Sequence, residues 1–171
     1  MKNIKKIKSV LVIIVVLSVL ITGLLVYNTT QTNAAPYSGR LTGINWFGFE
    51  TGNLVAHGLW SRDYKSMLQQ IHDLGFNCVR LPWCNEMLTG NPSGIQINEY
   101  GVDAYTNQKG LNLDLEGLSS IEVFDKVIQE CENLGLYVIL DNHSRQPDGY
   151  MSETLWYTSK TSEAQWISDW V

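Results

Sequence analysis

The sequence predicts an α/β fold built around a parallel sheet, and two observations carry that prediction. The stretches "DLGFNCVRL" at 73–81 and "NLGLYVILD" at 133–141 resemble each other, and each leads from a helical pattern into a strand. These strands are near-continuous apolar runs, which is typical of parallel strands that are covered on both faces. The loops after the strands are long, with about 35 residues between Pro82 and Leu118. Because loops at the carboxyl ends of parallel strands carry the site in such folds, we expect the functional residues there.

The order of elements is strand, helix, strand, helix, strand, helix. The first strand is expected at 41–47, and the first helix follows it with Ser61 as its N-cap. A second helix is expected to open with a capping box formed by Ser119 and Glu122. Gly75 and Gly135 follow the two helices, where a left-handed backbone ends a helix at little cost for glycine. A third helix is expected to start near Thr161. The apolar residues at helical spacing are Met67, Leu68, Ile71 and Leu74 in the first helix, and Val123, Phe124, Val127, Ile128, Cys131 and Leu134 in the second.

Two parallel architectures compete, a doubly wound open sheet and a (β/α)8 barrel. The stretch "NWFGFETGN" after the first strand has two glycines but no G-x-G-x-x-G and no P-loop lysine, and aromatic residues crowd where a phosphate would need bare backbone. The barrel is therefore preferred. A barrel takes about 250 residues, so we interpret the chain as the N-terminal part, about three β/α units, of a longer protein.

The N-terminus has the pattern of a secretory signal peptide. Four lysines precede an apolar run at 10–26, and the small-residue segment "TNAAP" follows it. We therefore assign 1–34 to a signal peptide and 35–171 to the exported domain, which predicts a secreted protein. The apolar run is also long enough to persist as a membrane anchor, so membrane association through residues 10–26 is the alternative.

Charge and motif content exclude several classes of function. Without residues 1–34 the chain keeps eight basic against 17 acidic residues, a formal charge of −9, which argues against nucleic-acid binding. The histidines are scattered and no Cys/His cluster occurs, so no metal site is predicted. A serine hydrolase lacks its G-x-S-x-G. Three cysteines allow at most one disulfide, and Cys78 and Cys131 are expected in the core.

Two polar residues stand at the carboxyl ends of predicted strands. Arg80 lies in "VRLPW", where a guanidinium among apolar neighbours must be paired and can hold a carboxylate in a fixed orientation. His143 directly follows the apolar strand "LYVIL", two residues after Asp141, and lies at the same end of the sheet as Arg80. Trp60 and Trp83, on long polar loops, could stack on sugar rings. His57, in "LVAHGLW", is a weaker candidate by the same argument as His143. Trp46 and Trp166 are interpreted as core residues.

Four segments in order resemble the N-terminal part of glycoside hydrolase family 5 cellulases. They are "LTGINWFGFETGN", "HGLWSRDYKSMLQQIHDLGFNCVRLPW", "LNLDLEGLSSIEVFDKVIQECENLGLYVILDNH" and "LWYTSKTSEAQWISDW", and they cover nearly all of 41–171. The resemblance implies a (β/α)8 barrel, a β-1,4-glucan substrate, no metal or organic cofactor, and retaining hydrolysis by two glutamates. It also implies that Arg80 hydrogen-bonds the nucleophile, that His143 lines the site beside the cleaved bond, and that Trp60 contacts glucose.

The two catalytic glutamates of the family match nothing in this sequence, and they are expected beyond it. Glu86, in "CNEML", lies in the loop after the second strand, not at a fourth strand. Glu50, Glu153 and Asp141 are acids on the expected face, and we interpret them as hydrogen-bonding or solvated residues. The family's opening β-hairpin is also replaced by the short "APYSGR", so we expect the isolated domain to be unstable or prone to aggregation. A second hypothesis is a non-catalytic carbohydrate-binding remnant that uses Trp60, Trp83 and Trp156 for stacking.

Overall fold

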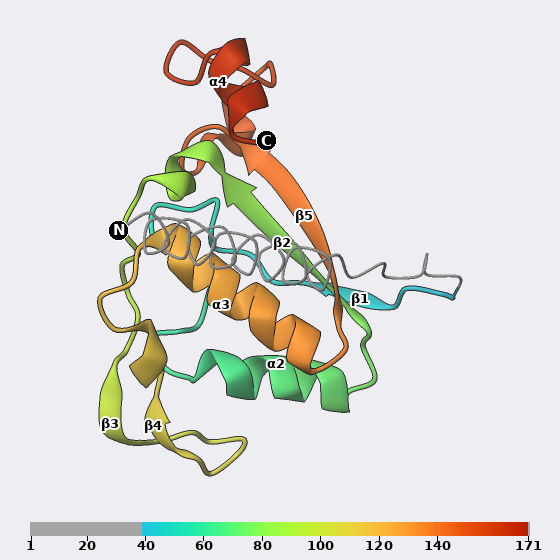
Figure 1. Ribbon diagram of the computed structural model, residues 1–171, viewed down its shortest axis with the longest axis vertical. Helices are drawn as coiled ribbons and strands as arrows, with labels where there is room; N and C mark the ends of the chain where they lie inside the picture. The colour runs from blue at the N-terminus through green and yellow to red at the C-terminus, as the bar shows by residue number, and fades with distance from the viewer. Residues whose placement is uncertain (1–38, 171) are drawn as a thin grey trace, which may run out of the picture. The chain divides into compact units, whose positions relative to one another are not determined.

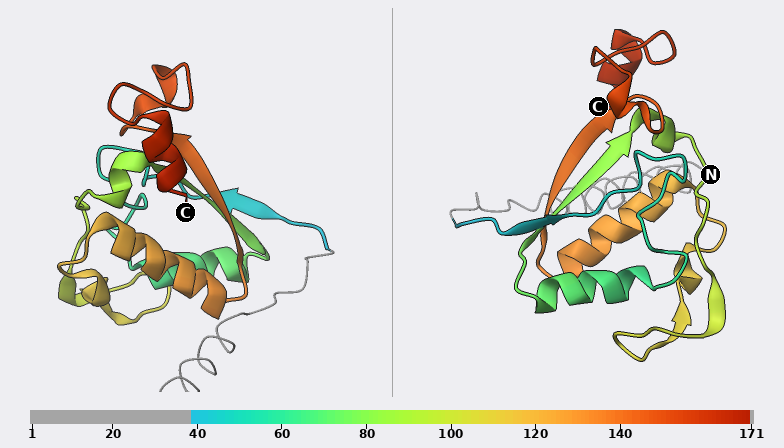
Figure 2. Two further views of the ribbon diagram at one scale, coloured as in Figure 1. Left: turned by 45° about the horizontal axis from the view of Figure 1, so that its top comes forward. Right: turned by 180° about the vertical axis from the view of Figure 1, so that it is seen from behind.

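The computed structural model describes residues 39–170, and these contain a three-stranded parallel sheet with two long helices on one face. The strands are β1 (Gly43–Asn45), β2 (Cys78–Cys84) and β5 (Tyr137–Ser144), in the order β1-β2-β5. The helices α2 (Tyr64–Asp73) and α3 (Ser120–Asn133) lie side by side against the sheet (Figure 1, Figure 2). This is the strand and helix order that the sequence predicts. The expected signal peptide and the apolar run at 10–26 lie outside the described residues.

The ends of the two long helices follow local sequence, with one correction. The N-cap of α2 is Asp63 and not Ser61, because the Asp63 carboxylate accepts hydrogen bonds from the backbone N–H groups of Lys65 and Ser66. The Ser61 hydroxyl instead donates to the Gly58 carbonyl and closes the preceding turn. The capping box of α3 is confirmed, with the Ser119 N–H donating to the Glu122 carboxylate at 2.8 Å.

Gly75 and Gly135 end the helices in the left-handed conformation, as predicted, with φ of +86° and +69°. A Cβ at either position would meet nothing within 4 Å, so conformation and not space selects glycine there.

The hydrophobic core lies between the sheet and the two helices. Phe49 and Phe124 meet edge to face with ring centroids 4.7 Å apart, which joins the loop after β1 to α3. All three cysteines are free and buried, and burial raises the pKa of Cys84 to about 11 and that of Cys131 to about 12. The core placement predicted for Cys78, Cys131 and Trp46 is confirmed. Fully buried core residues from the sheet and helices include Val79, Leu81, Leu68, Val123 and Val127.

The prediction that the strands are covered on both faces is wrong for β5 within the described residues. Tyr137, Ile139 and Leu140 are 44–45% exposed. The helices cover one face of the sheet only, and β5 pairs with β2 alone and so forms an edge. The first strand is also shorter than the expected 41–47.

The long connection from β2 to α3 contains a β-hairpin that the sequence pattern does not predict. Its strands β3 (Asn98–Val102) and β4 (Lys109–Leu111) are antiparallel, and it projects away from the sheet on the helix side (Figure 1). Asp103, at the start of its turn, is buried and accepts hydrogen bonds from the N–H groups of Tyr105 and Thr106. The same carboxylate bonds the Ser66 hydroxyl of α2, so the hairpin is fixed to that helix.

Short 3-10 turns and a final helix complete the described chain. The turns are Asn85–Leu88, Leu113–Leu115 and Gly149–Met151. The helix α4 (Glu163–Ser168) begins close to the predicted position and is capped by Ser162, whose hydroxyl accepts the N–H of Gln165 at 3.2 Å. Together with the loop after β5, α4 lies over the carboxyl ends of β2 and β5 (Figure 1). No helix within residues 39–170 is both long and apolar enough to cross a membrane.

Candidate functional site

Arg80 is held from both sides at the carboxyl ends of the three parallel strands. Its register partner on β1 is Asn45, and the Arg80 Nη1 donates to the Asn45 side-chain oxygen. Its Nη2 lies 2.5 Å from Oδ2 of Asp141 on β5. The pairing that the sequence requires of Arg80 is therefore present, and the guanidinium stays about a third exposed. Groups on the two neighbouring strands therefore orient both terminal nitrogens of the guanidinium.

His143 belongs to the same cluster. Its Nδ1 lies 2.8 Å from the Asp141 carboxylate and 3.3 Å from Nη2 of Arg80. The Tyr150 ring lies against the imidazole, with centroids 5.5 Å apart. The structure thus brings together Arg80 and His143, which the sequence predicts for one site. It adds Asn45 and Asp141 as their direct partners.

A second group, which we call the aromatic patch, consists of Phe47, His57 and Trp60. His57 lies between the other two, with ring centroids 4.3 Å from each. Phe47 and Trp60 are 41% and 46% exposed. The predicted pair His57 and Trp60 is therefore in contact, and Phe47 is an addition. The local sequence gives no signal for Phe47, because Trp46 and Phe49 of the same "WFGF" are buried and strand alternation would place Phe47 with Phe49.

The loop that carries the aromatic patch is fixed by backbone contacts. The Trp46 indole N–H donates to the His57 carbonyl at 2.8 Å, and the His57 N–H donates to the Phe47 carbonyl at 2.9 Å. Gly48, at φ +137°, sits where a Cβ would come within 2.3 Å of the Val55 carbonyl oxygen. Only glycine allows this close approach of the two chain segments, so the patch is held in place before any ligand arrives.

Trp83 differs from the expectation of an open, sugar-facing ring. It lies inside β2 and not on the loop after it, because the strand runs on to Cys84, and it is 5% exposed. Its ring contacts Trp170 of the final turn at 5.3 Å. The sequence predicts Trp166 as a core residue, but within the described residues it is only half-buried and lies outside the hydrophobic core. Its indole N–H donates to Asn142, next to His143. Trp156 is 40% exposed and contacts Trp166.

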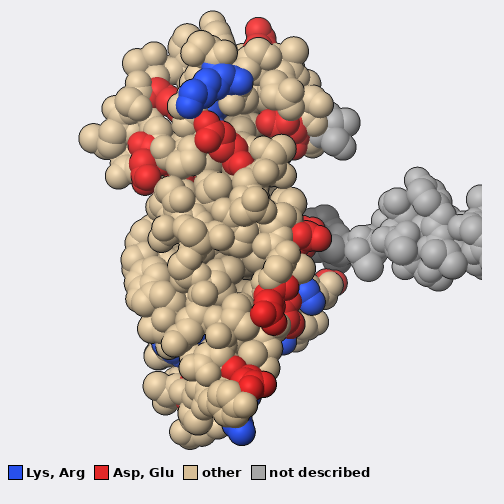
Figure 3. Space-filling view, turned by 90° about the vertical axis from the view of Figure 1, so that its left-hand side faces the viewer, with Lys and Arg blue, Asp and Glu red and all other residues tan. Residues whose placement is uncertain are grey.

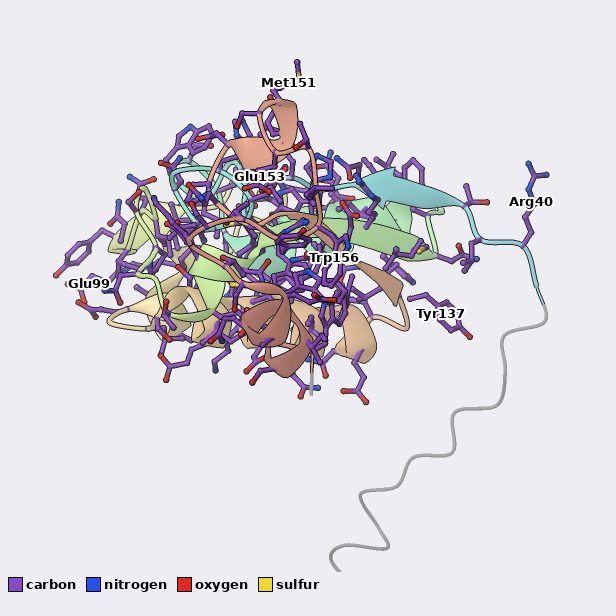
Figure 4. All side chains as sticks on the ribbon, turned by 90° about the horizontal axis from the view of Figure 1, so that it is seen from above. Arg40, Glu99, Tyr137, Met151, Glu153 and Trp156 are labelled. Atoms are coloured by element: carbon purple, nitrogen blue, oxygen red, sulfur yellow. The ribbon has the colours of Figure 1, made fainter. Side chains whose placement is uncertain are left out.

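The acids near these groups are bound within their own loops. Glu50 is buried and accepts the Gly48 N–H at 2.7 Å. Glu153 accepts the N–H groups of Arg145 and Gln146 at 2.7 and 2.8 Å, and with Trp156 it lies in the loop after β5 (Figure 4). The hydrogen-bonding interpretation of Glu50, Glu153 and Asp141 is confirmed. Glu86 is the exception, since it is 43% exposed and lies 3.8 Å from the Lys160 ammonium.

One pocket lies apart from the cluster of Arg80 and His143. An open pocket of about 410 Å³ lies in the loop after β5, with Asp148, Glu153 and Tyr157 among its lining residues, and neither Arg80 nor His143 lines it. Within residues 39–170 no group of three or more His, Cys, Asp or Glu side chains is arranged to hold a metal ion. The face in Figure 3 carries dispersed acidic side chains and no continuous basic patch.

Comparison with known proteins gives a consistent result. The family model described as cellulase (glycosyl hydrolase family 5) matches residues 33–171. The major extracellular endoglucanase of Xanthomonas campestris pv. campestris is 45% identical over 130 residues, which are 76% of this chain and 24% of that protein. An endoglucanase of Paenibacillus polymyxa is 39% identical over 149 residues, 84% of this chain and 34% of that protein. The chain therefore spans about a quarter to a third of the length of these curated relatives.

Solved structures agree with these relatives. The catalytic domain of the Xanthomonas campestris enzyme is similar with a TM-score of 0.64 and 44% identity, over 77% of this chain and 34% of that one. A complex of an endocellulase from Pyrococcus horikoshii with cellotetraose is similar with a TM-score of 0.64 and 42% identity, over 77% of this chain and 32% of that one. The fold is thus the N-terminal part of a (β/α)8 barrel, as the sequence predicts.

Proposed function

Because the chain belongs to the cellulase family, glycosyl hydrolase family 5, we propose that it supplies part of the active site of an enzyme that hydrolyses internal β-1,4-glucosidic bonds of β-glucans. The observation that carries this proposal is the cluster of Arg80, Asp141 and His143 at the carboxyl ends of β2 and β5, the face on which barrel enzymes place their sites. The cellotetraose complex of the related endocellulase supports a β-glucan as the substrate class.

Arg80 acts in this proposal by orienting an acid. Its guanidinium is fixed by Asn45 and Asp141, and its remaining N–H groups can hold the carboxylate of a nucleophilic glutamate ionised and correctly turned. A glycosyl-enzyme intermediate would then form on that glutamate, while a second glutamate about 5 Å away donates a proton to the leaving oxygen and later accepts one from water. No cofactor takes part in this mechanism.

The aromatic patch acts by binding. The exposed Trp60 ring offers a flat apolar surface to the face of a glucose unit, and His57 offers a polar edge beside it. His143, on the same face as Arg80, lines the position of the cleaved bond. Trp83 takes no part in this binding, since its ring is buried.

Both catalytic glutamates are proposed to come from sequence outside these 171 residues. Glu50 and Glu153 support this, because their carboxylates are already occupied by backbone N–H groups that hold their loops. Glu86 is open but pairs loosely with Lys160. On its own the chain is therefore expected to show no turnover of soluble cellulose, and activity that is lost on changing Glu86 or Glu153 would contradict this assignment.

The test uses the product of the gene as it continues past codon 171. We expect it to lower the viscosity of soluble cellulose, the signature of internal cleavage. Arg80→Lys is expected to lower kcat/KM about a hundredfold, because an ammonium cannot replace a fork held by two partners. Arg40→Lys, at the opposite end of the sheet (Figure 4), is the matched control and should keep activity. An Arg80→Lys enzyme with unchanged kcat/KM would contradict the role of Arg80, and an immediate stop codon would contradict the enzyme itself.

Secretion is part of the same proposal. The Xanthomonas campestris relative is named an extracellular endoglucanase, and the N-terminal pattern fits cleavage near residue 34, with anchoring through residues 10–26 as the alternative. Sequencing the N-terminus of the protein from culture medium and from membranes separates the two. Protein that stays in the cytoplasm would contradict both.

A second candidate function is carbohydrate binding without catalysis, and the exposed aromatic patch favours it. In that case the chain alone should be retarded in a gel that contains soluble β-glucan, and Trp60→Ala should abolish the retardation. Tyr100→Ala, which removes a 75% exposed ring from the hairpin, is the control and should leave it unchanged. Retardation that survives Trp60→Ala would contradict this function.

A further inference from the structure

One carboxylate oxygen joins the two predicted site residues. Oδ2 of Asp141 lies 2.5 Å from Nη2 of Arg80 and 2.8 Å from Nδ1 of His143. Asp141 and His143 are two residues apart on β5, so their side chains leave the same face of the sheet. The Asp141 side chain is about a quarter exposed, so water screens its charge less than it would screen a fully exposed carboxylate.

The two contacts of His143 Nδ1 require opposite protonation states. A bare Nδ1 could accept a hydrogen from Arg80 Nη2 at 3.3 Å, but its lone pair would then face the carboxylate at 2.8 Å. A protonated Nδ1 donates to Asp141 at a normal hydrogen-bond distance and only forgoes the long contact with Arg80. The shorter contact involves a full negative charge, and hydrogen bonds to charged groups are the stronger ones. The Nδ1–H form is therefore selected.

We propose that Asp141 is a positioning residue that holds His143 in its Nδ1–H tautomer and so leaves Nε2 as a hydrogen-bond acceptor for a sugar hydroxyl. This inference rests on the proposed function, because the hydroxyl that would donate to Nε2 belongs to a bound sugar. A ring flip would replace the Nδ1–H with a C–H toward Asp141, and the neighbouring Tyr150 ring also limits rotation of the imidazole. Asp141 thus sets both the tautomer and the orientation of the ring, as carboxylates do for histidines in other sites.

Asp141 also links His143 to Arg80. The negative charge that selects the tautomer is the one that pairs with the guanidinium, so the two residues are oriented by a single side chain. Asn45 fixes the other end of the guanidinium without adding charge. Removal of the Asp141 charge should therefore disturb His143 directly, whereas removal of a charge elsewhere should not.

The experiment is nitrogen NMR of the full chain labelled with ¹⁵N-histidine and kept monomeric by a mild detergent, at a pH where the imidazoles are neutral. The chain has three histidines, and His57→Gln and His72→Gln assign the signals. We expect His143 to be almost wholly Nδ1–H. In Asp141→Asn the ratio of Nδ1–H to Nε2–H should fall about tenfold or more, the effect of losing a hydrogen bond to a charged acceptor. Asp125→Asn, which removes a charge from an exposed position on α3, should leave the ratio unchanged.

The result that overturns the proposal is an Nε2–H His143 in the unchanged chain with a dispersed, folded backbone amide spectrum, which needs no variant and so does not depend on how Asp141→Asn folds. A ratio that is the same in Asp141→Asn, with the backbone amide spectrum preserved, also overturns it. The tautomer is measured without substrate or turnover. If His143 is Nδ1–H but the longer gene product does not cleave glucan, the tautomer assignment stands and only the proposed function fails.

Discussion

The two faces of the sheet differ in what they carry. On the face under α2 and α3, Val79 and Leu81 of β2 are fully buried, and their neighbours are the apolar sides of both helices. On the other face, Arg80 between them is about a third exposed, and Ile139 of β5 is 45% exposed. The covered face therefore supplies the stability of the chain, while the open face collects the polar side chains of the candidate site. A substitution at a covered position should therefore affect stability more than a substitution at an exposed position.

The largest effect is expected from a charge on the covered face. Leu81 and Leu140 are register partners on β2 and β5 and so point to the same side of the sheet, but Leu81 in the central strand is fully buried and Leu140 on the edge strand is 45% exposed. Leu81→Lys would bury an unpaired ammonium, which costs several kcal/mol and is comparable to the whole stability of a small domain. Leu140→Lys should cost about 1 kcal/mol or less.

The measurement is the soluble fraction of the full chain and its near-ultraviolet circular dichroism. Leu81→Lys is expected to be insoluble or to lose the near-ultraviolet signal, and Leu140→Lys to be at least as soluble as the unchanged chain. Equal behaviour of the two variants would remove the distinction between the covered centre of the sheet and its exposed edge strand.

The exposed edge strand β5 should make residues 35–171 self-associate when they are purified alone. Tyr137, Ile139 and Leu140 are exposed on an edge strand whose outer backbone groups pair with no other strand of the described sheet. Such edges promote aggregation, and a lysine on them opposes it. We expect light scattering that rises with concentration and falls when Ile139 and Leu140 are both changed to lysine. A monomeric protein with a cooperative melt and native near-ultraviolet dichroism would show that the exposed edge strand does not drive association.

The covered face could be predicted from the sequence more fully than the open one. Helical spacing locates α2 and α3, and two glycines locate their ends, because each of these signals is local. The pairing of Arg80 with Asn45 and Asp141 joins residues 35 and 61 positions apart, and only strand register brings them together. Arg80 and His143 could still be singled out, since both follow apolar runs. The sequence predicts Asp141 as a hydrogen-bonding acid, but it does not identify its partners.

Two other misses have the same cause. The sequence predicts Trp83 on a loop, because the expected strand ends before Pro82. In the structure β2 continues through Pro82 and Trp83 to Cys84. The β3–β4 hairpin has weak strand alternation, and it forms because Asp103 and the fully buried Asn112 bind α2 and the loop before it. The pairing of β2 with β5 that extends the strand, and the contacts of Asp103 and Asn112, join distant residues and cannot be predicted from the local sequence.

The smallest effect concerns that hairpin on the helix side. Burial alone would raise the pKa of Asp103, but hydrogen bonds from the Ser66 hydroxyl and from the N–H groups of Thr106, Tyr105 and Asp63 outweigh it and lower the pKa to about 2. Folding therefore favours the ionised form, whose stabilisation is complete above the ordinary aspartate pKa of about 4 and is lost as the pH falls from about 4 to about 2. This shift corresponds to about 2 kcal/mol.

The measurement is the pH dependence of the amide proton shifts of Tyr105 and Thr106 in the soluble Leu140→Lys chain. We expect a midpoint near pH 2, and Asp103→Asn should abolish the transition while it weakens the hairpin's hold on α2. Asp125→Asn again serves as the matched control. A midpoint near pH 4 would mean that the Asp103 carboxylate gains nothing from its contacts, and that the hairpin is attached to the helix layer by its other contacts, including the hydrogen bonds of Asn112.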